Sequence, residues 1–282
     1  MDIANSSQRI GKHKFKISNF LQYLLLIILA LIVIGPFLLG LWTSFLPTSS
    51  ITKGSLAGSL TFDNYVTAVQ TTPVLRYLLN SFIVSIIRTV GEVLLCSMAA
   101  YAFVFLKFKG RNFIFYLFLA TMMLPFEAEV IPNFMTVKSM NLLNTYSVMI
   151  IPFLTSAFGT FMLRQSFLQI PTDLKEESDV EGLSHFQFYW HVVLPYSKIT
   201  LLTLAAYSFL SSWNEYLWPM LTTFSDQYRT VQAGLRQMQS TETFNNWGMI
   251  MASAVIVVIP TLIILFVGQH FFKSGLNDGS VK

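Results

Sequence analysis

The stretch KEESDVEGLSHFQFYWHVVLP, residues 175–195, is polar and charged although long apolar stretches lie on both sides of it. Within six residues it carries four carboxylates, those of Glu176, Glu177, Asp179 and Glu181. The whole chain of 282 residues is 54% hydrophobic and only 11% charged, whereas a soluble domain carries about 25% charged residues. The composition therefore predicts a membrane protein that keeps this stretch outside the lipid.

Six apolar segments are long enough to cross a bilayer, which takes about 20 residues of helix. They are residues 20–45, 82–106, 112–135, 146–167, 199–222 and 247–272. Basic residues precede the first segment, as in a signal peptide, but its apolar run is too long and no cleavage site of small residues follows closely. We therefore expect the first segment to be retained, giving an all-α membrane protein with six transmembrane helices.

The distribution of basic residues predicts the orientation of these spans. With the N-terminus inside, twelve Lys and Arg residues fall in cytoplasmic segments and five outside, while Arg88 lies within a span, which accounts for all 18. Because basic residues are in excess in cytoplasmic loops, we expect both termini in the cytoplasm. The predicted organisation is a cytoplasmic segment at 1–19, a six-helix membrane domain at 20–272 with a cytoplasmic loop at 171–198, and a cytoplasmic tail at 273–282.

Two short helices joined by a glycine are predicted within the loop. Asp173 with Glu176 forms the acidic variant of a capping box, so a helix is expected to follow Asp173 as its N-cap. Gly182 suits the left-handed position that ends a helix. Such a loop resembles an amphipathic helix lying on the membrane surface. However, helices of that kind present Lys and Arg to anionic lipid, so four clustered acids favour a protein partner.

The second predicted helix begins at a Ser-x-x-Gln capping box formed by Ser184 and Gln187. Pro195 is expected to end this helix or to bend it into the next span. Helical spacing places three positions on one face, namely Phe186, Tyr189 or Trp190, and Val193.

The loop resembles the EAA loop of ABC-importer permeases, in which a coupling helix enters a groove of an ATPase subunit. The matching residues are Glu176-Glu177-Ser178, then Glu181-Gly182 and, eleven residues later, Leu194-Pro195. Glu177 and Ser178 stand where the family prefers alanine. The resemblance covers nearly the whole chain and is to the carbohydrate-uptake branch, of the maltose-permease inner-subunit or glycerol-3-phosphate permease type. Further matching runs are Phe62-Asp63-Asn64-Tyr65, Asn80-Ser81, Ala99-Ala100-Tyr101-Ala102-Phe103, Phe108-Lys109-Gly110-Arg111-Asn112, Trp213-Asn214-Glu215-Tyr216-Leu217-Trp218-Pro219 and the tail Gly275 to Lys282.

The resemblance implies a permease subunit of an ATP-driven, binding-protein-dependent importer in a bacterial inner membrane. The expected substrate is an oligosaccharide, or a polyol phosphate such as glycerol-3-phosphate, moved by alternating access. The expected partners are a second permease subunit forming a heterodimer, two ATPase subunits, an external substrate-binding protein and membrane lipid. Coupling is assigned to Glu176, Glu177, Ser178, Glu181, Gly182, Leu194 and Pro195.

The sequence lacks the residue patterns typical of ATP binding, metal binding and nucleic-acid binding. The chain has no G-x-x-x-x-G-K-[ST] phosphate loop, so we expect no enzyme activity and no cofactor of its own, with ATP and magnesium bound by the ATPase subunits. The four histidines and the single Cys96 show no spacing typical of a metal site. No basic patch alternates with exposed aromatic residues, so nucleic acid is not an expected partner.

Two groups of residues are candidates for the substrate pathway. Charges within spans cost about 2.5–3.5 kcal/mol each and usually face a cavity or a partner. Arg88 and Glu92, four residues apart on one helix, are expected to form an ion pair or to contact substrate. The second group combines aromatic faces with an amide and a carboxylate, which suits sugar binding, although an interfacial aromatic belt explains it equally. It consists of Trp213, Asn214, Glu215 and Tyr216.

An ion-coupled secondary transporter or channel is the alternative function. In such a protein, the pairs Arg88 and Glu92 and Glu127 and Glu129 would form an ion or proton relay. That alternative predicts uptake without ATPase subunits.

Overall fold

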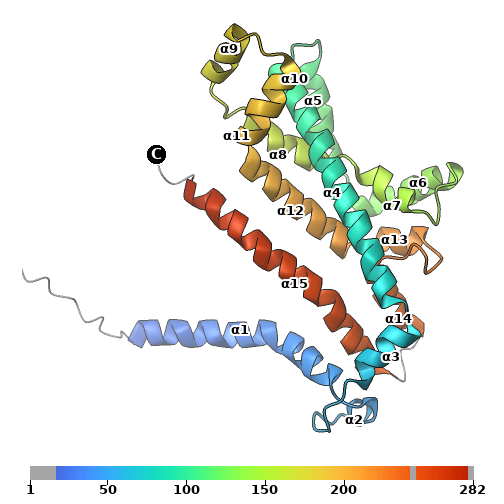
Figure 1. Ribbon diagram of the computed structural model, residues 1–282. Helices are drawn as coiled ribbons and strands as arrows, with labels where there is room; N and C mark the ends of the chain where they lie inside the picture. The colour runs from blue at the N-terminus through green and yellow to red at the C-terminus, as the bar shows by residue number, and fades with distance from the viewer. Residues whose placement is uncertain (1–16, 242–245, 279–282) are drawn as a thin grey trace, which may run out of the picture.

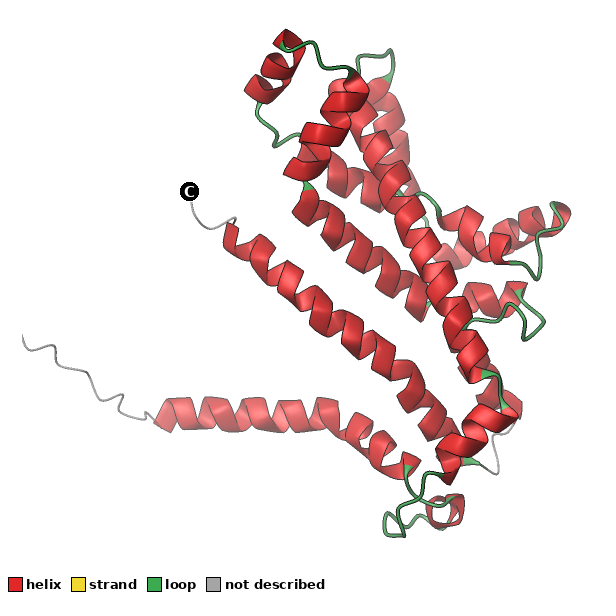
Figure 2. Cartoon of the chain, viewed as in Figure 1, coloured by secondary structure: helices red, strands yellow, loops and turns green. Residues whose placement is uncertain are grey.

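The computed structural model of the protein describes residues 17–241 and 246–278, and in these ranges the regular secondary structure is helical, without strands (Figure 2). The longest described helices are α1 (Ile17–Ser44), α4 (Val74–Phe105) and α15 (Trp247–Asp278). Helix α4 runs the length of the packed part of the molecule, while α1 projects away from it (Figure 1). No residue in the most apolar part of α1 is buried by the rest of the described chain. An apolar helix that stays exposed in this way needs lipid or another protein around it.

The centre of the packing lies where α4 contacts α8 (Ala157–Phe167) and α12 (Lys198–Asn214). Cys96 of α4, Leu163 of α8 and Leu204 of α12 are fully buried in one cluster there. Burying a leucine side chain stabilises the fold by about 1.5–3 kcal/mol. This three-helix contact therefore holds the membrane part of the chain together.

Three of the six predicted spans are interrupted by breaks in the helix. The chain turns by 101° between α5 (Arg111–Thr121) and α6 (Phe126–Ser139), where Pro125 is extended. Helix α7 (Tyr146–Ile150), with the 3₁₀ turn η1 (Ile151–Phe153), is bent by 42° from α8. Helix α12 ends at Asn214, before α13 (Leu217–Thr222). Average hydropathy does not detect these breaks, because they depend on single proline and capping residues.

By length and composition, two described helices can cross a membrane, Gln22–Ser44 and Val74–Phe105. The number is up to five if each of three bent pairs is one span, namely α5 with α6, Tyr146–Phe153 with α8, and His185–Tyr196 with α12. Trp247–Ile263 is a shorter apolar helix. The predicted segment at 1–19 lies largely outside the described residues, and so do the last four residues of the predicted tail at 273–282, of which α15 forms the part up to Asp278.

Short helices occupy both ends of α4 (Figure 1). Near its start lie α2 (Thr48–Thr52), α3 (Asp63–Thr71) and α14 (Val231–Thr241). Near its end lie α9 (Thr172–Val180) and a second loop helix. This second helix is continuous through α10 (His185–Phe188), the π-helical turn η2 (Tyr189–Val193) and α11 (Leu194–Tyr196). The predicted loop at 171–198 is therefore a pair of helices at one end of the molecule.

At the end of the molecule opposite the loop helices, polar side chains join neighbouring segments by hydrogen bonds. Asn80 of α4 donates from Nδ2 to the carbonyls of Gln227 and Arg229, at 3.1 and 2.8 Å, and its Oδ1 accepts from the hydroxyl of Tyr146 at 2.7 Å. The hydroxyl of Ser81 accepts from the amide of Val231 at 2.8 Å. Buried hydrogen bonds of this kind restrict how α4, α7 and the start of α14 can move relative to one another.

Candidate functional site

The acidic helix α9 begins two residues earlier than the capping prediction requires. Thr172 is its first residue and Pro171 occupies the N-cap position without a side-chain hydrogen bond. The prediction of Asp173 as the N-cap is therefore wrong, because Pro171 already has the extended ψ of 138° that precedes a helix. Asp173 instead lies in the first turn, where a carboxylate is stabilised by the helix dipole.

The two residues that replace family alanines lie on opposite sides of α9. Ser178 is buried and its hydroxyl donates to the carbonyl of Lys175 at 2.8 Å. Glu177 is exposed, as are Glu176 and Glu181. Ser178 therefore faces the rest of the chain, whereas Glu177 faces outward.

Helix α9 combines negative charge with one strongly exposed apolar residue. The side chain of Val180 is 89% exposed and lies between Asp179 and Glu181. Lys175 forms an ion pair with Asp179, and its ammonium lies 5.3 Å from the centre of the Phe188 ring. The outward surface of α9 is therefore acidic, with an exposed valine at the last residue of the helix.

Gly182 ends α9 as the sequence predicts. Its φ is +76°, and the amide of Leu183 donates to the carbonyl of Ser178 at 2.9 Å, which closes the end of the helix. A Cβ placed on Gly182 would meet no atom within 4 Å. Glycine is therefore favoured at this position by the backbone conformation and not by lack of space.

The second loop helix begins at the predicted capping box, with Ser184 and Gln187 bonded reciprocally. The prediction of a single aromatic face is wrong, because the helix has two. Phe186 and Trp190 stack on the exposed side with their planes 12° apart, whereas Tyr189 and Val193 are buried. The π-helical turn between Tyr189 and Val193 changes the direction of the side chains along the helix.

Hydroxyl groups attach the buried side of this helix to α4. The hydroxyl of Tyr101 donates to the carbonyl of His185 at 3.0 Å, and the hydroxyls of Ser97 and Tyr189 lie 2.7 Å apart. The rings of Tyr101 and Tyr189 meet edge to face at 5.3 Å. Sequence reasoning assigned no role to Ser97 and Tyr101; the available signal was that both are polar residues near the loop end of an apolar span.

Leu194 and Pro195 connect the loop to α12. Leu194 is half-buried against the central cluster and Pro195 occupies the first turn of α11. Helix His185–Tyr196 makes an angle of 78° with Lys198–Asn214. The prediction that the helix ends or bends at Pro195 is therefore confirmed.

Arg88 and Glu92 are both buried, but the predicted ion pair between them is wrong. Within the described chain, their charged atoms do not come within 4.0 Å of each other. The two carboxylate oxygens of Glu92 accept from the hydroxyls of Ser156 and Ser208, each at 2.5 Å. The Arg88 guanidinium lies 3.9 Å above the Phe153 ring. Hydroxyls from α12 and from the N-cap of α8 therefore bind the carboxylate instead of the arginine.

The break between α12 and α13 contains the second group of pathway candidates. Trp213 is 1% exposed and packs against Phe82, so its ring is not accessible in this conformation. Glu215 accepts from the amides of Leu217 and Trp218, at 3.1 and 3.3 Å, and so caps α13. Asn214 is exposed and its amide donates to the Leu210 carbonyl at 2.9 Å.

Of the aromatic residues in this group, Tyr216 is therefore the one whose ring is accessible.

Glu127 and Glu129 lie in the first turn of α6. No hydrogen bond or ion pair in the described residues joins them to Arg88 or Glu92.

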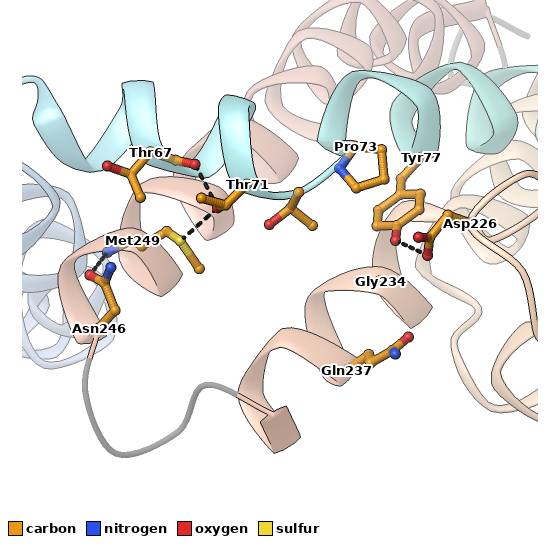
Figure 3. Close-up of a pocket in the computed structure, with 10 residues that line it drawn as sticks. Thr67, Thr71, Pro73, Tyr77, Asp226, Gly234, Gln237, Asn246 and Met249 are labelled. Atoms are coloured by element: carbon orange, nitrogen blue, oxygen red, sulfur yellow. Dashed lines mark hydrogen bonds between the residues drawn. The ribbon is translucent and has the colours of Figure 1, made fainter.

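A polar pocket opens at the end of the molecule opposite the loop helices (Figure 3). Its volume is about 270 Å³, and it lies between α3, the start of α4, α14 and the start of α15. Thr67 and Thr71 line one side, and Tyr77 donates to the carboxylate of Asp226 at 2.5 Å on the other. Asn246 completes the lining and bonds the amide of Met249 at 3.2 Å.

Known proteins resemble the chain along most of its length. Residues 92–277 match the family described as "Binding-protein-dependent transport system inner membrane component". The sn-glycerol-3-phosphate transport system permease protein UgpE of Yersinia pestis bv. Antiqua (strain Antiqua) is 36% identical over 210 residues, which is 74% of this chain and 75% of that one. The protein of the same name from Brucella abortus (strain 2308) is 31% identical over 273 residues, 93% of this chain and 97% of that one.

A solved structure shares the fold. It is a chain of a bacterial ABC transporter involved in the import of the acidic polysaccharide alginate, with a TM-score of 0.81. The match covers 96% of this chain and 100% of that chain at 22% sequence identity. Despite its interruptions, the helix arrangement is therefore that of an importer membrane subunit.

Proposed function

We propose a mechanism from the premise that the chain belongs to the binding-protein-dependent transport system inner membrane components. It is a permease subunit of an ABC importer, located in the inner membrane, and it is a transport component and not an enzyme. The loop at 171–198 couples it to a pair of ATPase subunits, which bind the ATP and magnesium. A second permease subunit and an external binding protein complete the importer.

The observation that carries this proposal is the division of the loop into an exposed acidic helix and an anchored aromatic helix. Glu177 and Val180 face away from the chain, while Tyr189 is buried against α4. A groove with basic residues around an apolar recess would complement the exposed side. Force applied to α9 would pass through its contact with Phe188 into the central cluster.

ATP binding and hydrolysis then select between two arrangements of the helices, since a ligand shifts an equilibrium by its different affinity for the two states. Tyr101 and Ser97 connect the loop to α4, and Leu163 and Phe167 of the same cluster connect it to α8. These contacts support movement of the loop together with α4 and α8. Closure of the ATPase pair would thereby open the permease to the outside.

The topology that we infer has six membrane crossings with both termini in the cytoplasm. The interrupted pairs would count as broken spans, which lipid tolerates where protein satisfies the free backbone groups. Support comes from α4 and α15, which both run between the end with α14 and the end with the loop helices (Figure 1). The polar pocket of Thr71 and Asp226 would then face the external binding protein.

The substrate that we infer is a carbohydrate or a polyol phosphate. The relatives at 36% and 31% identity are named for sn-glycerol-3-phosphate, and the structural neighbour is titled for an acidic polysaccharide. A polyol phosphate is the first candidate and an oligosaccharide the second. The proposed contacts are Arg88, whose Nε is buried without a hydrogen bond, and Tyr216 and Asn214 at the helix break, where Glu215 caps α13.

A charge reversal tests the coupling proposal. Glu177→Lys places a cation on the exposed side of α9, and we expect fewer ATPase subunits to purify with the permease, with a larger loss at low salt than at high salt. Glu127→Lys, at an exposed position on α6, is the matched control. Equal ATPase recovery from Glu177→Lys and from the unmodified importer would contradict the proposal.

A further inference from the structure

A basic hollow lies where α4 joins α5. Lys107, Lys109 and Arg111 occur within five residues, and no Asp or Glu occurs between Glu92 and Glu127. The hollow has a volume of about 440 Å³ and is lined by Lys107, Phe108, Gly110, Arg111, Asn112 and Phe113. Its lining therefore carries positive charge without a compensating carboxylate.

The hollow lies at the same end of the molecule as the coupling loop. Tyr101 donates to His185, and the rings of Phe105 and Phe188 meet at 5.2 Å, so the end of α4 contacts the second loop helix. If the loop is cytoplasmic, as the proposed function requires, the hollow opens at the cytoplasmic surface of the membrane. The lipid leaflet there is rich in anionic headgroups.

Backbone geometry prepares the hollow for an anion. Gly110 has a φ of +80° and precedes α5, which has 11 residues and no side-chain cap on its first amides. A Cβ at Gly110 would meet nothing within 4 Å, so the space beside these amides is open. Uncapped amides at a helix start attract negative charge. Arg111 is held in place through Nη1, which donates to the carbonyls of Val104 and Leu106 at 3.3 and 3.2 Å.

The surface next to the hollow is apolar. Phe113 is 68% exposed, Tyr116 65% and Leu117 51%, all on α5, and Phe108 is 41% exposed beside the lysines. A free phosphate ion would use the cations but would leave this apolar surface uncovered. A lipid would use both, because its acyl chains would lie along α5 while its phosphate is bound by the lysines.

We propose that this hollow binds the phosphate of an anionic phospholipid of the cytoplasmic leaflet. Lys107 and Lys109 contact the phosphate, Arg111 and the first amides of α5 orient it, and Phe113 contacts the acyl chains. Basic residues that serve only to orient spans need no open hollow. The lipid would fix the turn beside the end of α4, close to the coupling loop.

The test uses the permease purified with whatever subunits accompany it. Dioleoylphosphatidylglycerol and dioleoylphosphatidylcholine are titrated separately, and bound lipid is counted by native mass spectrometry. We expect preferential binding of phosphatidylglycerol, and the double variant Lys107→Gln, Lys109→Gln should weaken it about tenfold. Lys198→Gln, an exposed lysine at the start of α12, is the matched control and should leave binding unchanged.

Two results would overturn the lipid site. One is equal phosphatidylglycerol binding by the double variant and the unmodified protein. The other is displacement of phosphatidylglycerol by an equal concentration of inorganic phosphate, which would assign the hollow to the free ion. Recovery of ATPase subunits is scored in the same preparations, so failure of the coupling proposal is seen separately from failure of the lipid site.

Discussion

The hydroxyl of Tyr189 lies 2.7 Å from the hydroxyl of Ser97, so the coupling loop shares a buried hydrogen bond with α4. Both residues are nearly inaccessible, and Tyr189 also packs against Tyr101. Because this hydrogen bond is buried, it holds the two side chains in one fixed arrangement. The exposed charged side chains of α9 are not held in this way. It is the point at which movement of the loop would become movement of a membrane helix.

Ser97→Ala should therefore destabilise the protein by about 1–3 kcal/mol, because it leaves the buried hydroxyl of Tyr189 without a partner. Tyr189→Phe removes that hydroxyl and should cost less, and the double variant should resemble Tyr189→Phe alone. Thermal unfolding of the purified importer measures the three costs. Strictly additive costs would show that the two hydroxyls do not interact.

The same bond should matter for coupling. With Tyr189→Phe, the amount of substrate imported per ATP hydrolysed should fall, while the ATPase subunits still purify with the permease. Uptake and ATP hydrolysis in reconstituted vesicles measure this ratio. An unchanged ratio would mean that the loop acts on α4 through packing alone.

Substitutions at Gly182 can distinguish strain in the backbone from a clash between the new side chain and its neighbours. Gly182→Val forces a β-branched residue to a φ of +76° and should cost about 1–2 kcal/mol. It should reduce substrate-stimulated ATP hydrolysis or ATPase attachment while membrane insertion is retained. Gly182→Asn should behave nearly like the native chain, because asparagine adopts this conformation readily and the site has room for a side chain. Equal effects of valine and asparagine would contradict the conformational explanation.

Glu92 should contribute mainly to stability. Glu92→Gln keeps the shape but replaces one acceptor oxygen with a donor, so that the hydroxyl proton of one of Ser156 and Ser208 loses its acceptor. We expect a loss of about 1–3 kcal/mol and a lower unfolding temperature, with an unchanged KM for uptake. Ser208→Ala should show part of the same loss. A raised KM at normal stability would instead place Glu92 in contact with substrate.

Substitutions of the two aromatic residues at the α12–α13 break should have different effects, one on stability and the other on uptake. Trp213 is buried in a core cluster, so Trp213→Ala should destabilise the fold by about 3–5 kcal/mol. Tyr216 is half-exposed, and Tyr216→Ala should raise the KM for uptake with little change in thermal stability. Uptake kinetics together with thermal unfolding distinguish the two. Loss of stability in both variants would assign Tyr216 to the core as well.

The local features of the loop were predictable because they depend on residues three or four positions apart. Ser184 and Gln187 form their capping box within a single turn, and Gly182 adopts the left-handed conformation that most other residues avoid. The start of α9 was misplaced by two residues because a proline already had the required extended backbone. The spacing of Glu176, Gly182 and Pro195 also led to the correct family, because that pattern belongs to one kind of loop.

The amino-acid sequence by itself determined that this is a helical membrane protein with an acidic loop, since composition and short-range patterns fix both. Only the tertiary structure decided which side chains meet. Arg88 and Glu92 share one helix, yet Glu92 is bonded by serines from α8 and α12. Tyr101 and Ser97 gained a role only because the loop helix packs on α4. The physical reason is that these contacts join residues from 60 to more than 110 positions apart, and no local periodicity records them.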